Sequence, residues 1–269
     1  MEKTKVLFVN QEITPYLTES PMSTIGRYLP QGIQEKGKEI RTFMPRYGNI
    51  NERRNQLHEV IRLSGMNLII DDNDYPLIIK VASIQSARMQ IYFIDNEDYF
   101  QRKFIFRDKN DKFFEDNDER AIFFSRGVLE TIKKLGWSPD VVHCHGWVTS
   151  LIPLYVKKAF KDNPLFCDTK VFLSLYDDDF EETLNKDFYK KFKLDGITDA
   201  DLTHYKKPEY GSLIKAAIDN SDALIMGSEN INAELEKYAR STGKPLLEYQ
   251  PEETYIQTYS DFYDKILAE

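Results

Sequence analysis

Short apolar runs alternate with amphipathic segments along most of this chain. The run KVLFVN (5–10) is apolar on both faces, as a central parallel strand is. EIRTFMP (39–45) and MQIYFID (89–95) are further predicted strands. Over residues 23–36 apolar side chains recur at helical spacing, and Gly37 ends the segment. The first strand, helix and second strand therefore predict a right-handed βαβ unit.

The alternation continues to the end of the chain. The remaining predicted helices are 118–135, 149–160, 212–219 and 230–240, and the remaining strands are 141–143, 169–176 and 222–228. An irregular, β-rich insertion is predicted near residues 50–90. We predict an α/β fold with a Rossmann-like, doubly wound and mostly parallel sheet, with helices on both faces, over residues 1–250. Residues 251–269 are predicted to form an amphipathic helix that packs on the same domain.

The overall charge excludes some classes of partner. The net charge is −8 and the sequence pI is about 5.2, so binding to nucleic acid or to an anionic membrane surface is not expected. No run reaches the roughly 18 apolar residues of a membrane span, and the first residues lack a signal-peptide pattern. Two cysteines do not make a disulfide framework. We therefore expect reduced thiols and a cytoplasmic protein.

Four segments together resemble a known family. They are KVLFVNQEITPY…LPQGIQEKGKEIRTFMPRYG, IYFIDNEDYFQRKFIF…DKFFEDNDERAIFFSRGVLE, PDVVHCHGWVTSLIPLYVK and AAIDNSDALIMGSENINAEL. In this order and spacing they resemble the N-terminal, starch synthase catalytic domain of bacterial glycogen synthases and plant starch synthases. MPRYG and FEDNDERAIFFSR are the most specific parts. The resemblance implies one lobe of a GT-B glycosyltransferase, which transfers glucose from ADP-glucose to an α-1,4-glucan and needs neither a metal nor another cofactor.

One loop departs from the family pattern. After E-[VI]-x-P-[FY] the family reads K-T-G-G-L, but here the lysine falls on Thr18 and the two glycines fall on Ser20 and Pro21. Glycine lets free backbone N–H groups approach a phosphate, whereas proline has no N–H. Glu19 adds negative charge beside them. We therefore predict that residues 18–21 form a degenerate donor loop, poorly suited to a sugar diphosphate.

A histidine matches the family's catalytic region. His145 in HCHGW corresponds to the family histidine that contacts the donor sugar, although a structurally retained, buried histidine is the alternative. His143 is expected to be buried support, and a metal site at His143, Cys144 and His145 is disfavoured because no further ligand cluster lies nearby. Trp147 is a candidate for stacking on a sugar or nucleotide, with a core tryptophan as the alternative.

Two further pairs are candidates for substrate binding. Asp116 and Asn117 match a family D-N pair near the acceptor face, and an N-cap for the following helix is the alternative. Glu12 and Tyr16 match the residues that precede the donor loop, and they complete the predicted substrate-binding set. Arg102 is expected to anchor a loop.

The chain also departs from the family near its third and fourth segments. Tyr176 stands where the family has the asparagine of a His-Asn pair, so a donor-side polar group is lost. Residues 177–179 could form a D-x-D metal–nucleotide motif, but a solvated acidic loop is favoured. Ser228 is a plausible N-cap of the next helix.

The resemblance leaves several functions open. The chain ends soon after the family's first domain, so the second domain, which carries the positive groups for the diphosphate, is expected to be missing. We expect a glycogen or starch synthase-like protein that is inactive alone. The alternatives are a transferase completed by a partner domain, a non-catalytic glucan-binding or scaffolding module, and a Rossmann-like domain with a new small ligand. Expected ligands are ADP-glucose or an α-glucan. A homodimer contact, another partner or the terminal helix is expected to shield the open face.

Overall fold

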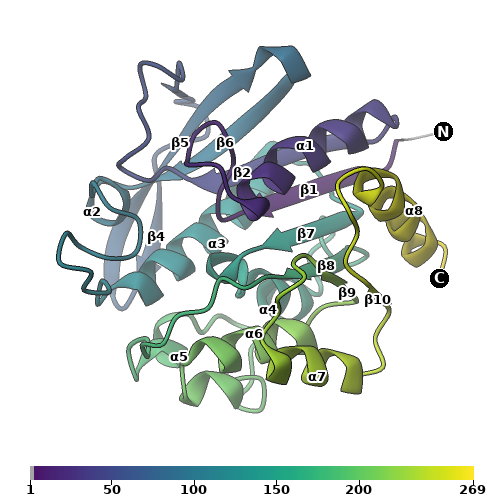
Figure 1. Ribbon diagram of the computed structural model, residues 1–269. Helices are drawn as coiled ribbons and strands as arrows, with labels where there is room; N and C mark the ends of the chain where they lie inside the picture. Colours follow the sequence, from purple (N-terminus) through teal and green to yellow (C-terminus); the bar gives the residue numbers. More distant parts are fainter. Residues whose placement is uncertain (1–2) are drawn as a thin grey trace.

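The computed structural model describes residues 3–269 (Figure 1). The strands are β1 (Lys5–Asn10), β2 (Glu39–Pro45), β3 (His58–Glu59), β4 (Met66–Ile70), β5 (Asn73–Ile84), β6 (Met89–Asp95), β7 (Val141–His145), β8 (Lys170–Leu175), β9 (Ala223–Met226) and β10 (Leu246–Leu247). The α-helices are α1 (Pro21–Glu35), α2 (Glu97–Phe100), α3 (Asn117–Leu135), α4 (Ile152–Leu154), α5 (Phe188–Lys191), α6 (Tyr210–Asp219), α7 (Ala233–Ser241) and α8 (Tyr255–Leu267). Shorter or irregular helical turns are η1 (Gln85–Ala87), η2 (Trp147–Thr149), η3 (Tyr155–Ala159) and η4 (His204–Lys206).

The strands form one mixed sheet. Within the described residues its order is β10-β9-β8-β7-β1-β2-β6-β5-β3, and β4 pairs with β5. Neighbours from β10 to β6 are parallel, while the partners of β5 are antiparallel to it. The predicted Rossmann-like, mostly parallel sheet is confirmed, and β1, β2 and β6 have the predicted bounds. The predicted β-rich insertion corresponds to β3, β4 and the long strand β5.

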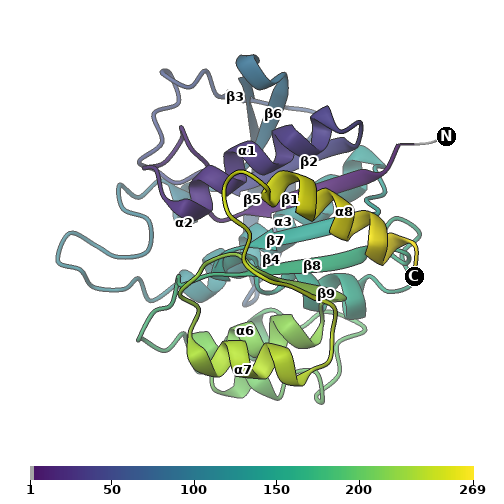
Figure 2. The same cartoon turned by 45° about the vertical axis from the view of Figure 1, so that its right-hand side comes forward.

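Helices cover both faces of the sheet. α1 and α8 lie side by side on one face, as Figure 2 shows. Alternate residues of the central strands point toward them, including Val6, Phe8, Val141 and Phe172. From α8 the buried hydrophobic side chains are Tyr255, Tyr259, Phe262, Tyr263 and Ile266. The amphipathic pattern of the tail thus corresponds to a helix that lies on the sheet, as its apolar spacing requires.

The opposite face carries the larger core. α3, α4 and α6 contribute to it, and residues such as Leu7, Val9 and Val142 point into it from the strands. The helical segment expected over residues 149–160 is confirmed, although its form is irregular: the chain passes from the 3-10 turn η2 through α4 to the π-helical turn η3. The strand expected at 141–143 continues to His145 and pairs with β1 and β8.

The strand order places a crevice at a defined point. β1 lies between β2 and β7, and the chain moves to opposite sides of β1 when it forms these two strands. In open α/β sheets ligands bind outside the carboxyl ends of the strands at such a switch point. Asn10 and His145, the last residues of β1 and β7, are register partners there. We therefore expect the functional site at this end of the sheet.

Candidate functional site

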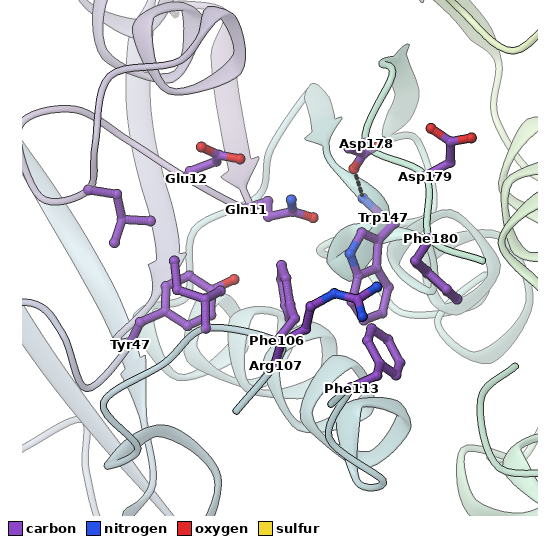
Figure 3. A pocket seen from close by; sticks show the side chains of 12 residues that line it. Gln11, Glu12, Tyr47, Phe106, Arg107, Phe113, Trp147, Asp178, Asp179 and Phe180 are labelled. Carbon is purple, nitrogen blue, oxygen red and sulfur yellow. Dashed lines mark hydrogen bonds between the residues drawn. The ribbon is translucent and has the colours of Figure 1, made fainter. Parts of the chain in front are cut away.

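A cavity of about 270 Å³ opens at the carboxyl ends of β1 and β7 (Figure 3). Five segments line it: the loops that follow β1, β2, β7 and β8, and the loop that precedes α3. We call it the aromatic cavity. The residues that line it are Gln11, Glu12, Leu17, Tyr47, Ile105, Phe106, Arg107, Phe113, Trp147, Asp178, Asp179 and Phe180.

Aromatic rings make up one wall of the aromatic cavity. The ring centroid of Trp147 lies 5.0 Å from that of Phe106 and 5.0 Å from that of Phe180. Phe113 stacks on Phe180 with centroids 5.1 Å apart. Rings in mutual contact hold one another in fixed orientations, so they form a preformed apolar surface.

Polar groups face this wall. The Tyr47 side chain is only 1% exposed, and its hydroxyl has no hydrogen-bond partner among residues 3–269. In Figure 3 this hydroxyl points toward the interior, between Gln11 and Phe106. Burial raises the pKa of Tyr47, so the phenol is neutral and keeps its O–H donor. A buried hydroxyl without a partner is costly, and a bound ligand would satisfy it.

Asp178 supplies a carboxylate from the loop after β8. It accepts hydrogen bonds from the Trp147 backbone N–H at 2.8 Å and from the Tyr210 hydroxyl at 2.6 Å. Desolvation by burial raises the pKa of Asp178 from 3.8 to about 6, against the lowering effect of these bonds. The hypothesis of a solvated acidic loop is therefore wrong for Asp178, which is half-buried, although Asp177 and Asp179 are exposed.

The predicted pair Asp116 and Asn117 lies outside the aromatic cavity. Asp116 forms a two-pronged ion pair with Arg102, one contact being 2.6 Å, and makes no side-chain cap bond. Asn117 donates to the Phe106 carbonyl at 2.9 Å and accepts from Arg120 at 2.6 Å. Both residues thus anchor the ends of the loop that carries Phe106 into the cavity wall, and Arg102 has the expected anchoring role.

His145 and His143 are sealed inside the fold. His145 is fully buried, its Nδ1 lies 2.9 Å from the Tyr176 hydroxyl, and its Nε2 has no partner among the described residues. Desolvation lowers the pKa of His145 to about 3, so the ring is neutral near pH 7. His143 lies 2.6 Å from the Tyr263 hydroxyl and 2.7 Å from Ser174 Oγ, which fits buried support. In residues 3–269 no group of three or more His, Cys, Asp or Glu could hold a metal ion.

The degenerate donor loop is closed by its own hydrogen bonds. Ser20 is the N-cap of α1 and Pro21 is the first helical residue. Ser20 Oγ accepts from the Ser23 N–H at 3.0 Å and donates to Glu12 at 2.9 Å, and the Ser20 N–H donates to Ser23 Oγ at 2.8 Å. This capping box uses the amides that a phosphate would need, and Glu12 already places a carboxylate at the helix N-terminus.

A second, larger depression lies beside this loop. It has a volume of about 580 Å³ and is bounded by the start of α1, the loops after β8 and β9, and the segment that leads into α8. We call it the acidic groove, because the carboxylates Glu19, Asp177, Glu229 and Glu252 line it and none of its lining residues is lysine or arginine.

The structure brings together some of the predicted residues. Glu12 and Trp147 lie in the aromatic cavity, and Glu19, Ser20 and Pro21 lie along the acidic groove. Thr18 is exposed beside them, and its carbonyl accepts from Ser23 Oγ at 3.2 Å. Tyr16 packs edge-on against Phe93 with centroids 4.9 Å apart and does not line the cavity. Ser228 is not the N-cap of α7; that position is Asn232, whose side chain accepts from two backbone N–H groups.

Sequence reasoning missed several cavity residues. Tyr47 was visible only as part of the MPRYG motif, and Asp178 only as part of an acidic run. Phe106 and Phe113 lie in a loop without periodicity, so only their aromatic character could have marked them. The role of His145 as a donor contact stays a prediction.

Comparison with known proteins identifies the family. The family model described as starch synthase catalytic domain matches residues 5–247. The chain belongs to this family. Similar relatives include the glycogen synthases of Chlorobium luteolum, 35% identical over 84% of this chain and 46% of the relative, and of Pelodictyon phaeoclathratiforme, 32% identical over 91% of this chain and 50% of the relative. The chain thus spans about half the length of these curated relatives.

A solved structure shares the fold of this starch synthase catalytic domain. The catalytic domain of starch synthase IV from Arabidopsis thaliana, bound to ADP and acarbose, matches with a TM-score of 0.72 and 18% identity. The match covers 92% of this chain and 51% of that one. Among the described residues no helix has the length and apolar character to cross a membrane. The cytoplasmic location stays a prediction.

Proposed function

We propose that this chain binds the end of an α-glucan in the aromatic cavity and does not by itself transfer glucose from ADP-glucose. Membership of the starch synthase family supports a glucan as the ligand. The Arabidopsis structure of the same fold is described as bound to ADP and acarbose, which supports a ligand site within this architecture. The aromatic cavity lies at the switch point where such folds bind ligands.

The observation that carries this proposal is the pairing of rings with acceptors in one small cavity. The C–H faces of a glucose ring pack well on flat apolar surfaces such as Phe106 and Trp147. Its hydroxyls would donate to the carboxylates of Glu12 and Asp178 and accept from the unpartnered Tyr47 hydroxyl. A volume of about 270 Å³ suits a chain end rather than a long glucan segment.

The same geometry argues against a diphosphate. The donor loop offers a self-satisfied capping box, a proline and the nearby Glu12 carboxylate instead of free amides and an ammonium group. The acidic groove beside it is lined by carboxylates without a lysine or arginine. The one cation of the aromatic cavity, Arg107, is bound to Glu182 through two contacts of 2.6 and 2.8 Å. Stabilisation of a leaving diphosphate needs preorganised positive groups, which these surfaces do not supply.

Isothermal titration of maltotetraose tests the glucan half of the proposal. We expect saturable binding that Phe106→Ala weakens by about tenfold, the equivalent of ~1.4 kcal/mol. Phe104→Ala is the matched control, because Phe104 belongs to the same loop but is 44% exposed and does not line the cavity. Equal loss in both variants, or no binding of maltotetraose to the unaltered chain, would refute the glucan site.

A transfer assay tests the other half. Radiolabelled ADP-glucose and a glycogen primer should give no incorporation above a boiled control when the chain is present alone. Incorporation would overturn the proposed inactivity while leaving the glucan site intact. Incorporation only after addition of a separate GT-B C-terminal domain would show a transferase that a partner completes.

A further inference from the structure

A third cavity lies at the opposite end of the sheet from the aromatic cavity. It has a volume of about 540 Å³ and lies where the amino ends of β2 and β6 separate. Parallel pairing between β2 and β6 begins only at Thr42 and Ile91, so the earlier residues of these two strands do not pair with each other. The residues that line this two-arginine cavity are Gln34, Ile40, Arg41, Ser83, Ile84, Gln85, Arg88, Met89, Gln90 and Tyr92.

The charge of the two-arginine cavity is opposite to that of the chain. Its lining contains Arg41 and Arg88 and no aspartate or glutamate, although the net charge of the protein is −8. Within residues 3–269 neither arginine forms an ion pair with a carboxylate. Two other arginines of the described residues line cavities, and both are paired, Arg102 with Asp116 and Arg107 with Glu182. Two unpaired guanidinium groups at one cavity leave its donors available for an external oxyanion.

Arg41 is held in place on one side of the cavity. One of its terminal nitrogens donates to the Tyr92 hydroxyl at 2.9 Å. The guanidinium carbon lies 5.2 Å from the ring centre of Trp137 and 5.8 Å from that of Tyr92. Its Nε is buried and has no hydrogen-bond partner among the described residues. Ring contacts and one hydrogen bond thus fix this guanidinium before any ligand arrives.

Arg88 comes from the hairpin between β5 and β6, which projects at the top of Figure 1. Its backbone has φ = 50° in the left-handed region, at the C-cap of η1. Glycine or asparagine is favoured at such a position, and an arginine there is strained. The side chain is exposed and makes no hydrogen bond with another residue in 3–269, so nothing within the described chain explains its presence.

Uncharged polar groups also line the cavity, beside the apolar Ile40, Ile84 and Met89. Gln34, Ser83, Gln85 and Gln90 make no side-chain hydrogen bond to other residues in the described part of the chain. Amides and a hydroxyl can both donate to and accept from sugar hydroxyls. An uncharged glucan would gain nothing from two guanidinium groups, and two arginines are too few for nucleic-acid binding by a chain of this charge.

We propose that the two-arginine cavity binds a small phosphorylated sugar, with Arg41 and Arg88 on the phosphate and the amide side chains on the sugar hydroxyls. Guanidinium groups match the geometry of phosphate oxygens, and one from strand β2 and one from the β5–β6 hairpin can contact different oxygens of the same group. This site is distinct from the aromatic cavity and does not depend on the proposed glucan function.

Isothermal titration with glucose 1-phosphate, inorganic phosphate and glucose tests the proposal. We expect glucose 1-phosphate to bind more tightly than inorganic phosphate, and glucose not to compete with it at this site. Arg88→Gln should raise the Kd for glucose 1-phosphate by about tenfold, as loss of a charge-assisted contact does. Arg62→Gln is the matched control, because this substitution removes the same charge from an exposed arginine that does not line the cavity.

Three results would overturn the proposal: no binding of glucose 1-phosphate, equal weakening by Arg88→Gln and Arg62→Gln, or inorganic phosphate binding as tightly as glucose 1-phosphate. Titration of maltotetraose into Arg88→Gln should give the affinity of the unaltered chain. That result shows that the variant is folded, and it separates failure of this site from failure of the glucan site.

Discussion

The hydroxyl of Tyr263 provides a direct test of whether α8 packs against the rest of the domain. It lies 2.6 Å from Nδ1 of His143, and both side chains are fully buried under the helix. Tyr263→Phe keeps the ring and removes this contact, which leaves a buried imidazole nitrogen without its partner. Such a loss costs about 1–3 kcal/mol. For a domain of this size each kcal/mol lowers the Tm by about 2–4 °C, so we expect a decrease of roughly 5 °C.

Thermal unfolding followed by circular dichroism measures this effect. Tyr28→Phe is the matched control, because Tyr28 lies on the neighbouring helix α1 but is 48% exposed. Removal of the Tyr28 hydroxyl should change the Tm by less than about 1 °C, as surface substitutions do. If the two variants have the same Tm, α8 does not pack on His143 as described, and the integration of residues 251–269 into the domain is refuted.

Three further variants test other parts of the structure. Burial raises the pKa of Asp178 from 3.8 to about 6, so the folded state holds this proton more tightly than the unfolded state does. The resulting stability is present at low pH and is lost as the pH rises from about 4 through about 6. Urea unfolding from pH 4 to 7 should show the wild type losing up to about 3 kcal/mol relative to Asp178→Asn, and a difference constant with pH would contradict this. At Gly146 an added Cβ would lie 2.5 Å from Cβ of Gln11, whereas at Gly37, also at positive φ, it meets nothing within 4 Å, so Gly146→Ala should lower the Tm well below that of Gly37→Ala. Truncation after Leu247 removes five buried hydrophobic side chains of α8, each contributing about 1.5–3 kcal/mol, and should give aggregated protein by light scattering; a soluble monomer would contradict this.

Much of the fold could be predicted because it depends on local pattern. β1, β2 and β6 each contain a short run of buried apolar residues, and their ends were predicted correctly. The segment 149–160 is helical as predicted, but it changes from the 3-10 turn η2 through α4 to the π-helical turn η3, a change that local periodicity does not show.

The candidate site was predicted only in part, because contacts between distant segments form it. Trp147 and Glu12 follow predicted strands, and the carboxyl ends of such strands at a switch point are where open α/β sheets bind ligands. Phe106 reaches the cavity because Arg120 donates to the carbonyls of Tyr99 and Ile105, and because Asn117 binds the Phe106 carbonyl. Such side-chain anchoring across a loop has no signature in a single sequence.

The most direct test of the proposed function is a crystal of this chain soaked with maltotetraose and ADP-glucose together. We predict electron density for a sugar ring against Trp147 and Phe106 in the aromatic cavity, and none for a pyrophosphate beside Ser20 and Pro21. A pyrophosphate held by residues 18–21, with the aromatic cavity empty, would contradict both halves of the proposal.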